Sequence, residues 1–144
     1  MIRTPMTKPH VLVADPEYII AMEAERILRE LMDCNVTIIN PHCSADRLGS
    51  SWTTYSLVLL DTGFCIGEIR VIAELLQRQG IPVVFTTAHQ AYTKGVPGFP
   101  TTPVVAKPYG PEQFAAVLPL LRLPNGTYGE IGRSVIAEKP GSGP

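Results

Sequence analysis

The sequence predicts an α/β domain built on a parallel β-sheet that is covered by helices on both faces. Short apolar runs alternate along its 144 residues with longer segments of helical periodicity. Strands that are apolar at nearly every position are buried on both faces, as in parallel sheets. The composition, with 45% hydrophobic and 17% charged residues, is that of an ordinary globular protein. The length suits one domain with a full hydrophobic core.

The first half of the chain is expected to contain two strands separated by a long helix. The apolar run at 11–14 is the first strand, and the β-rich run at 36–39 is the second. Five apolar residues at helical spacing form one face of the helix between them: Ile20, Ala24, Ile27, Leu28 and Leu31. Pro16 and Glu17 are expected in its first turn. A weak helix candidate follows at 44–48.

The next part of the chain continues the alternation and then interrupts it. Strands are expected in the runs that end at Asp61 and Thr87, with a helix at 68–78 between them. Residues 89–102 contain two glycines and two prolines and have no apolar period. A loop is therefore expected where the alternation calls for a fourth helix.

The last elements complete a doubly wound fold. A fifth strand is expected at 104–106, and the turn at 108–111 leads into a final helix. Four apolar residues mark the buried face of that helix: Phe114, Val117, Leu118 and Leu121. Five strands with four or five helices fit a flavodoxin-like, five-stranded parallel sheet.

Domain boundaries follow from where these patterns begin and end. The folded domain is expected at 8–123, after an N-terminal extension at 1–7. Glycine, proline, serine and lone charges dominate residues 124–144, which predicts a flexible C-terminal tail.

The composition and motifs of the chain argue against several classes of function. A net charge of −1 gives no electrostatic case for binding nucleic acid or an anionic membrane. No apolar run approaches the roughly 20 residues of a membrane helix. The three cysteines are odd in number and lack metal-type spacing, which favours reduced thiols in a cytoplasm. No strand is followed by a glycine fingerprint for a dinucleotide or a P-loop.

Polar residues end four of the predicted strands. Asp15 ends the first, Asp61 the third, Thr87 the fourth and Lys107 the fifth. Parallel strands present their carboxyl ends at one edge of the sheet, where open α/β folds place their chemistry. Two carboxylates, a hydroxyl and an ammonium at that edge are the groups that a phosphoryl-accepting site needs.

These residues make the chain resemble a response-regulator receiver domain of the CheY-like superfamily over about 8–123. The matching segments are 11–17, 57–61, 82–88 and 106–109, in the family's order and at about its spacing. The resemblance implies that Asp61 accepts a phosphoryl group from a phosphohistidine on a sensor histidine kinase. It also implies that Thr87 donates its hydroxyl to one phosphoryl oxygen, while Lys107 pairs with another.

The resemblance further implies a Mg²⁺ site and a signalling role. Asp15, Asp61 and the backbone near Gly63 would hold the ion, with Glu17 as a further acid. The protein would be a cytoplasmic, single-domain regulator and not an enzyme. It would act through contact with an unknown downstream protein. The sequence does not decide whether it is a monomer or a homodimer.

The chain departs from the family's pattern at two places. Pro16 stands where receivers carry a second adjacent acid, and Val104 stands where they commonly place a switching aromatic residue. Residues 85–88, Phe-Thr-Thr-Ala, partly match a subgroup of single-domain receivers with Phe-Ala-Thr-Gly and a short or missing fourth helix. That subgroup is linked to kinases of the second histidine-kinase class.

Other functions remain open at this point. The loss of an acid at Pro16 allows a pseudo-receiver, a binding module in which Mg²⁺-dependent phosphorylation is impaired. An enzyme of another flavodoxin-like family is the third alternative. Asp15 could also act only as a cap of the following helix.

Overall fold

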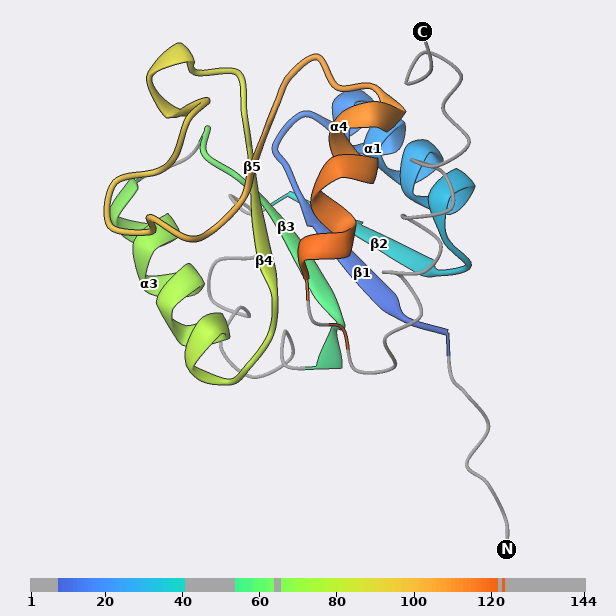
Figure 1. Cartoon of the computed structure of the whole chain (residues 1–144), viewed down its shortest axis with the longest axis horizontal. Helices are drawn as coiled ribbons and strands as arrows, with labels where there is room; N and C mark the ends of the chain where they lie inside the picture. Colours follow the sequence, from blue (N-terminus) through green and yellow to red (C-terminus); the bar gives the residue numbers. More distant parts are fainter. Residues whose placement is uncertain (1–7, 41–53, 64–65, 122, 124–144) are drawn as a thin grey trace, which may run out of the picture.

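The computed structural model describes residues 8–40, 54–63, 66–121 and 123, which form a five-stranded, all-parallel sheet flanked by helices (Figure 1). The strand order is β2-β1-β3-β4-β5, the doubly wound order of flavodoxin-like folds. This confirms the predicted fold class. The expected extension at 1–7, the helix candidate at 44–48 and the tail at 124–144 lie outside the described residues.

The strands and helices have the following bounds. The strands are β1 His10–Ala14, β2 Asn35–Ile39, β3 Leu57–Asp61, β4 Val83–Thr87 and β5 Val104–Ala106. The α-helices are α1 Tyr18–Leu31, α3 Ile66–Arg78 and α4 Pro111–Val117. Two short 3₁₀ helices are η3 Gln90–Tyr92 and η4 Leu118–Leu120. None of the described helices is long and apolar enough to cross a membrane.

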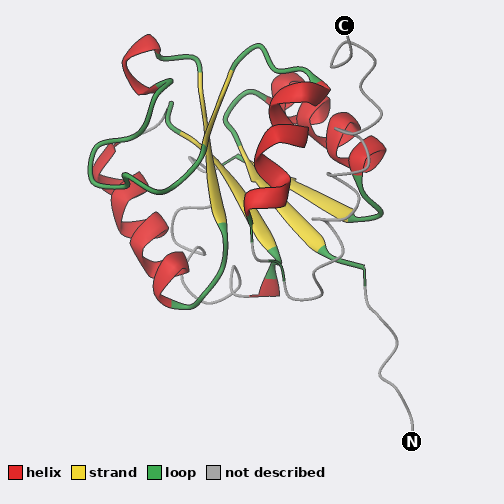
Figure 2. Ribbon diagram, in the orientation of Figure 1, coloured by secondary structure: helices red, strands yellow, loops and turns green. Residues whose placement is uncertain are grey.

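Both faces of the sheet are buried, each in its own hydrophobic cluster. Helices α1 and α4 cover one face and α3 covers the other (Figures 1 and 2). Val11 and Val13 of β1 belong to the cluster under α1, whereas Leu12 belongs to the cluster under α3. Because successive side chains of a strand point to opposite faces, a strand between two helical layers must be apolar at every position.

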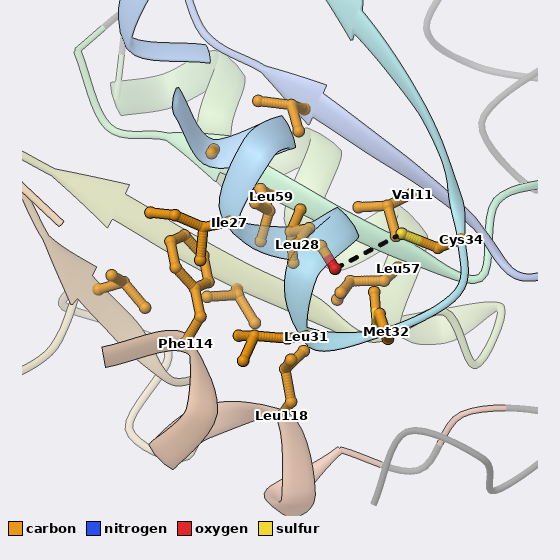
Figure 3. Packing of buried hydrophobic residues seen from close by; sticks show 14 of the residues in the cluster. Val11, Ile27, Leu28, Leu31, Met32, Cys34, Leu57, Leu59, Phe114 and Leu118 are labelled. Atoms are coloured by element: carbon orange, nitrogen blue, oxygen red, sulfur yellow. Dashed lines mark hydrogen bonds between the residues drawn. The ribbon is translucent and has the colours of Figure 1, made fainter. Parts of the chain in front are cut away.

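The cluster under α1 and α4 joins the first and last helices of the chain. Ile27 and Leu31 of α1 lie beside Phe114 of α4 and Leu118 of η4 (Figure 3). The Cys34 thiol lies 4.0 Å from the carbonyl oxygen of Leu28 in the same cluster. Burial raises the pKa of this thiol to about 11, which keeps it protonated and unreactive near neutral pH.

The segment between β4 and β5 is a loop with two apolar anchors, as expected. It contains only the single turn of η3 and an isolated bridge between Val96 and Phe99. Both residues of the bridge are buried in the cluster under α3. The ring of Phe99 packs edge-on against Phe85 of β4, with the ring centroids 5.3 Å apart. The loop is therefore held to the sheet although it lacks a fourth helix.

Helix α1 begins later than the sequence predicts. Pro16 and Glu17 precede it, and Glu17 has the extended backbone of an N-cap residue. The carboxylate of Asp15 accepts a hydrogen bond from the backbone N–H of Glu17 at 2.8 Å, which holds the chain in a turn before the helix. Asp15 is therefore not the N-cap of α1, which is Glu17, and its contact with Lys107 means that it does not act only on the helix.

Helix α4 ends earlier than predicted. It stops at Val117, and Leu118 lies in the 3₁₀ turn that follows. Pro119 explains this end, because proline has no N–H to donate and its ring clashes with the carbonyl four residues earlier. Phe114 and Leu118 are nevertheless both buried, as their apolar pattern predicted.

Candidate functional site

The strand-end residues are held at one edge of the sheet because backbone pairing continues one residue beyond the strands. The N–H of Asp15 donates to the carbonyl of Ile39, at 3.1 Å. The N–H of Thr62 donates to the carbonyl of Thr86 at 2.9 Å, and the N–H of Lys107 donates to that of Thr87 at 2.7 Å. These bonds fix the backbone from which each polar side chain projects.

Lys107 joins the two strand-end aspartates. Its ammonium lies 2.7 Å from Asp61 Oδ1 and 2.8 Å from Asp15 Oδ2. The three side chains are almost fully buried, with 6%, 4% and 1% of their area exposed for Lys107, Asp61 and Asp15. Buried carboxylates require a cation to offset the loss of hydration, and here the chain supplies that cation itself.

Burial and pairing act in opposite directions on these charges. Burial alone would lower the pKa of Lys107, but hydrogen bonds and charges from Asp15 and Asp61 outweigh it, and the pKa is raised. Lys107 is therefore protonated throughout the physiological range. Burial raises the pKa of Asp61, the Asp15 charge adds to this, and the Lys107 ammonium opposes it.

The carboxylate of Asp61 is oriented by three donors. Its Oδ2 accepts the N–H of Gly63 at 2.7 Å, while its Oδ1 faces Lys107 and lies 3.3 Å from the hydroxyl of Thr86. A Cβ atom on residue 63 would lie only 2.5 Å from Asp61 Oδ2. A side chain at position 63 would therefore displace the Asp61 carboxylate from this position.

Thr87 lies at this edge but is bonded away from Asp61. Its hydroxyl oxygen accepts the Thr62 hydroxyl at 2.6 Å and the N–H of His89 at 2.9 Å. Thr87 is fully buried and Thr62 is 8% exposed. The threonine hydroxyl that faces Asp61 is that of Thr86, the residue paired with Asp61 between β3 and β4.

Glu17 takes a different place from the other acids. Its side chain is 64% exposed, and its Oε1 lies 3.4 Å from the Lys107 ammonium. The strand-end acids are buried, whereas Glu17 reaches the same cation from solvent. Glu17 thus contributes charge at the rim of the site.

Whether a divalent cation fits this site depends on its two buried carboxylates, those of Asp15 and Asp61. Asp15 Oδ2 lies 2.8 Å from the Lys107 ammonium, which is its counter-ion, and has no other partner within the described part of the chain. Among the described residues, no three His, Cys, Asp or Glu side chains are arranged to hold a metal ion. Proteins commonly bind Mg²⁺ through one or two carboxylates together with substrate phosphates and water. The residues therefore fit Mg²⁺ only as a two-carboxylate site that phosphoryl oxygens complete.

The sequence analysis identified most of this site and missed two hydroxyls. Asp15, Asp61, Lys107 and the backbone at Gly63 come together as expected, and Glu17 reaches Lys107 from outside. Thr62 and Thr86 were assigned no role. Their adjacency to Asp61 and Thr87 in the sequence is the signal that could have drawn attention to them.

Comparison with known proteins places this fold among receiver domains. No protein-family model matches the chain, and no curated protein sequence matches it. Solved structures do match. A response regulator receiver protein from Sinorhizobium medicae WSM419 has a TM-score of 0.58 and 24% identity, over 74% of this chain and 88% of that one.

Two PhyR structures match at similar levels. The PhyR response regulator REC domain from Erythrobacter litoralis has a TM-score of 0.54 and 25% identity, over 77% of this chain and 87% of that one. The PhyR stress response regulator has a TM-score of 0.53 and 27% identity, over 76% of this chain but 43% of that longer one.

The protein therefore has the fold of a response-regulator receiver domain. This confirms the resemblance drawn from the strand-end residues. The narrower likeness to receivers with Phe-Ala-Thr-Gly stays a prediction, because Thr86 and Ala88 stand where that motif has alanine and glycine.

Proposed function

We propose that the protein is a response regulator of a two-component system in which Asp61 accepts a phosphoryl group from a phosphohistidine of a sensor histidine kinase. The observation that carries the proposal is the buried Asp61 carboxylate, fixed between the Lys107 ammonium and the N–H of Gly63. The protein acts in the cytoplasm as a signalling module and transmits its state by contact with a downstream protein.

The chemistry is a transfer between two phosphoryl carriers. A carboxylate oxygen of Asp61 forms a bond to phosphorus as the phosphorus–nitrogen bond of the donor breaks, and the imidazole nitrogen keeps the electron pair. Such transfers depend on positioning and on neutralising the phosphoryl charge. The donors to Asp61 hold its carboxylate for attack, and Lys107 supplies positive charge beside it.

Mg²⁺ belongs to this proposal as a weakly held cofactor. Asp15 and Asp61 would hold it, and the ion when bound would neutralise charge on the phosphoryl oxygens. Pro16 removes one carboxylate from the set that receivers use, which lowers the affinity for a hard cation. We therefore expect measurable Mg²⁺ binding mainly when a phosphodonor is present.

The test is intact mass spectrometry after incubation with acetyl phosphate, with and without Mg²⁺. The expected result is a phosphoryl adduct on the wild-type protein that disappears in Asp61→Asn. Asp33→Asn is the matched control, because the Asp33 side chain is 79% exposed in a surface ion pair with Lys8. Equal adducts on all three proteins, or none with acetyl phosphate or a phosphorylated histidine kinase, would contradict the proposal.

A pseudo-receiver is the second candidate. It is favoured by the position of the Lys107 ammonium, which bridges the two buried carboxylates that a metal ion would need. In that function the protein binds its partner without being phosphorylated. A Mg²⁺ titration with acetyl phosphate present separates the two, because the pseudo-receiver would show neither saturable Mg²⁺ binding nor an adduct.

A further inference from the structure

Thr62 is a buried hydroxyl residue beside the phosphoryl-accepting aspartate to which the proposed function gives no role. It directly follows Asp61, and its backbone N–H is bonded to the carbonyl of Thr86. The residue is 8% exposed. The branched side chain of threonine has few rotamers in such a place, so its hydroxyl has a defined direction.

That direction is toward Thr87. The hydroxyl of Thr62 donates to the hydroxyl oxygen of Thr87 at 2.6 Å, between residues 25 positions apart in the chain. The N–H of His89 donates to the same oxygen at 2.9 Å. A hydroxyl oxygen has two lone pairs and one proton, so these two donors occupy the acceptor capacity of Thr87 and leave its O–H as a donor.

Asp61 meets a different hydroxyl. Within the described part of the chain, the threonine hydroxyl that donates to Asp61 Oδ1 is that of Thr86, at 3.3 Å. The hydroxyl of Thr87 instead accepts hydrogen bonds from Thr62 and His89. A phosphoryl oxygen on Asp61 is an acceptor and would take the Thr87 O–H as its donor, while Thr62 and His89 hold the oxygen of that hydroxyl. Thr62 is therefore a positioning partner of the hydroxyl that the proposed function requires.

We propose that Thr62 is a positioning residue that fixes the Thr87 hydroxyl oxygen while leaving its O–H to donate, and that this hydrogen bond sets how readily Thr87 engages the phosphoryl group. The inference rests on the proposed function, because it concerns the response of the same site.

Replacement of Thr62 by valine tests this inference, because valine keeps the shape and removes the hydroxyl. Loss of the hydrogen bond that fixes the Thr87 hydroxyl should lower the ratio of phosphorylated to unphosphorylated protein about two- to tenfold at a fixed acetyl phosphate concentration. Thr62→Ser keeps the hydroxyl and should restore the wild-type ratio. Thr62→Ala provides a second variant that lacks the hydroxyl if the valine variant fails to fold.

A double-mutant cycle separates positioning from a general effect on the site. In a Thr87→Val background, Thr62→Val should leave the ratio unchanged, because the hydroxyl on which Thr62 acts is absent. An equal effect of Thr62→Val in both backgrounds would overturn the inference, as would a wild-type ratio in Thr62→Val and Thr62→Ala. Absence of any adduct on the wild-type protein would instead overturn the proposed function and this inference with it.

Discussion

Replacement of Lys107 by methionine removes the only cation that contacts both buried aspartates within the described part of the chain. The ammonium lies 2.7 Å from Asp61 Oδ1 and 2.8 Å from Asp15 Oδ2, and all three side chains are at most 6% exposed. Removing one partner of a buried ion pair costs about 3–5 kcal/mol of folding free energy. Because two carboxylates lose their counter-ion, we expect a loss of about 5 kcal/mol at neutral pH. That is a third or more of the total stability of a typical domain.

The loss should depend on pH. The pKa of Asp61 is already raised by burial, and removal of the ammonium raises it further. A carboxyl group whose pKa is higher in the folded than in the unfolded state destabilises the protein above its folded pKa and ceases to do so below its unfolded pKa. The difference between Lys107→Met and wild type should therefore be largest near neutral pH and shrink on acidification toward the unfolded pKa of about 4.

Urea unfolding across this pH range measures the effect, with Lys8→Met as the matched control. Lys8 pairs with Asp33 at 3.3 Å, but the two side chains are 54% and 79% exposed. Loss of such a surface pair costs at most about 1 kcal/mol. Equal losses in the two variants, or a loss in Lys107→Met that does not change with pH, would refute the assignment of Lys107 as the counter-ion of the buried acids.

Three further changes test other parts of the molecule. Pro16→Asp should raise Mg²⁺ affinity about tenfold or more by restoring a carboxylate, as measured by calorimetric titration; an unchanged affinity would contradict the role given to Pro16. Gly63→Ala should slow phosphorylation by acetyl phosphate more than about tenfold, because its Cβ would lie 2.5 Å from Asp61 Oδ2 and displace the carboxylate. A wild-type rate would argue against a fixed carboxylate. Phe99→Ala should cost about 3–5 kcal/mol in urea unfolding, whereas Lys94→Ala in the same loop is exposed and should cost little; equal losses would mean that the loop is not anchored.

The fold could be predicted from the sequence because its pattern is local. Strands such as 57–60 are apolar at every position, and a strand is apolar throughout only where both faces of a sheet are covered. The helix spanning 18–31 shows its buried face directly, through Ala24, Ile27, Leu28 and Leu31 at helical spacing. Strand ends then follow from where each apolar run stops, which placed Asp15, Asp61 and Lys107 at one edge.

The sequence predicted the ends of the helices less accurately than the fold, because the end of a helix depends on single side chains. Pro16 and Glu17 are residue types that favour the first turn of a helix. The Asp15 carboxylate instead accepts a hydrogen bond from the N–H of Glu17, and α1 begins only at Tyr18. The last helix has an apolar pattern that continues through Leu121, but Pro119 ends its α-helical part at Val117. In both cases a single residue, Asp15 or Pro119, outweighs the apolar periodicity of the whole segment.

One part of the site can be predicted from the order of residues along the chain, and the other part is decided only by tertiary packing. The spacing of acids, hydroxyl and lysine at strand ends is visible along the chain, because parallel strands bring their carboxyl ends together whatever the side chains do. Which hydroxyl faces Asp61 depends on the rotamers of Thr62, Thr86 and Thr87 within a closely packed sheet edge. Such bonds join residues 25 positions apart, and no periodicity along the chain encodes them.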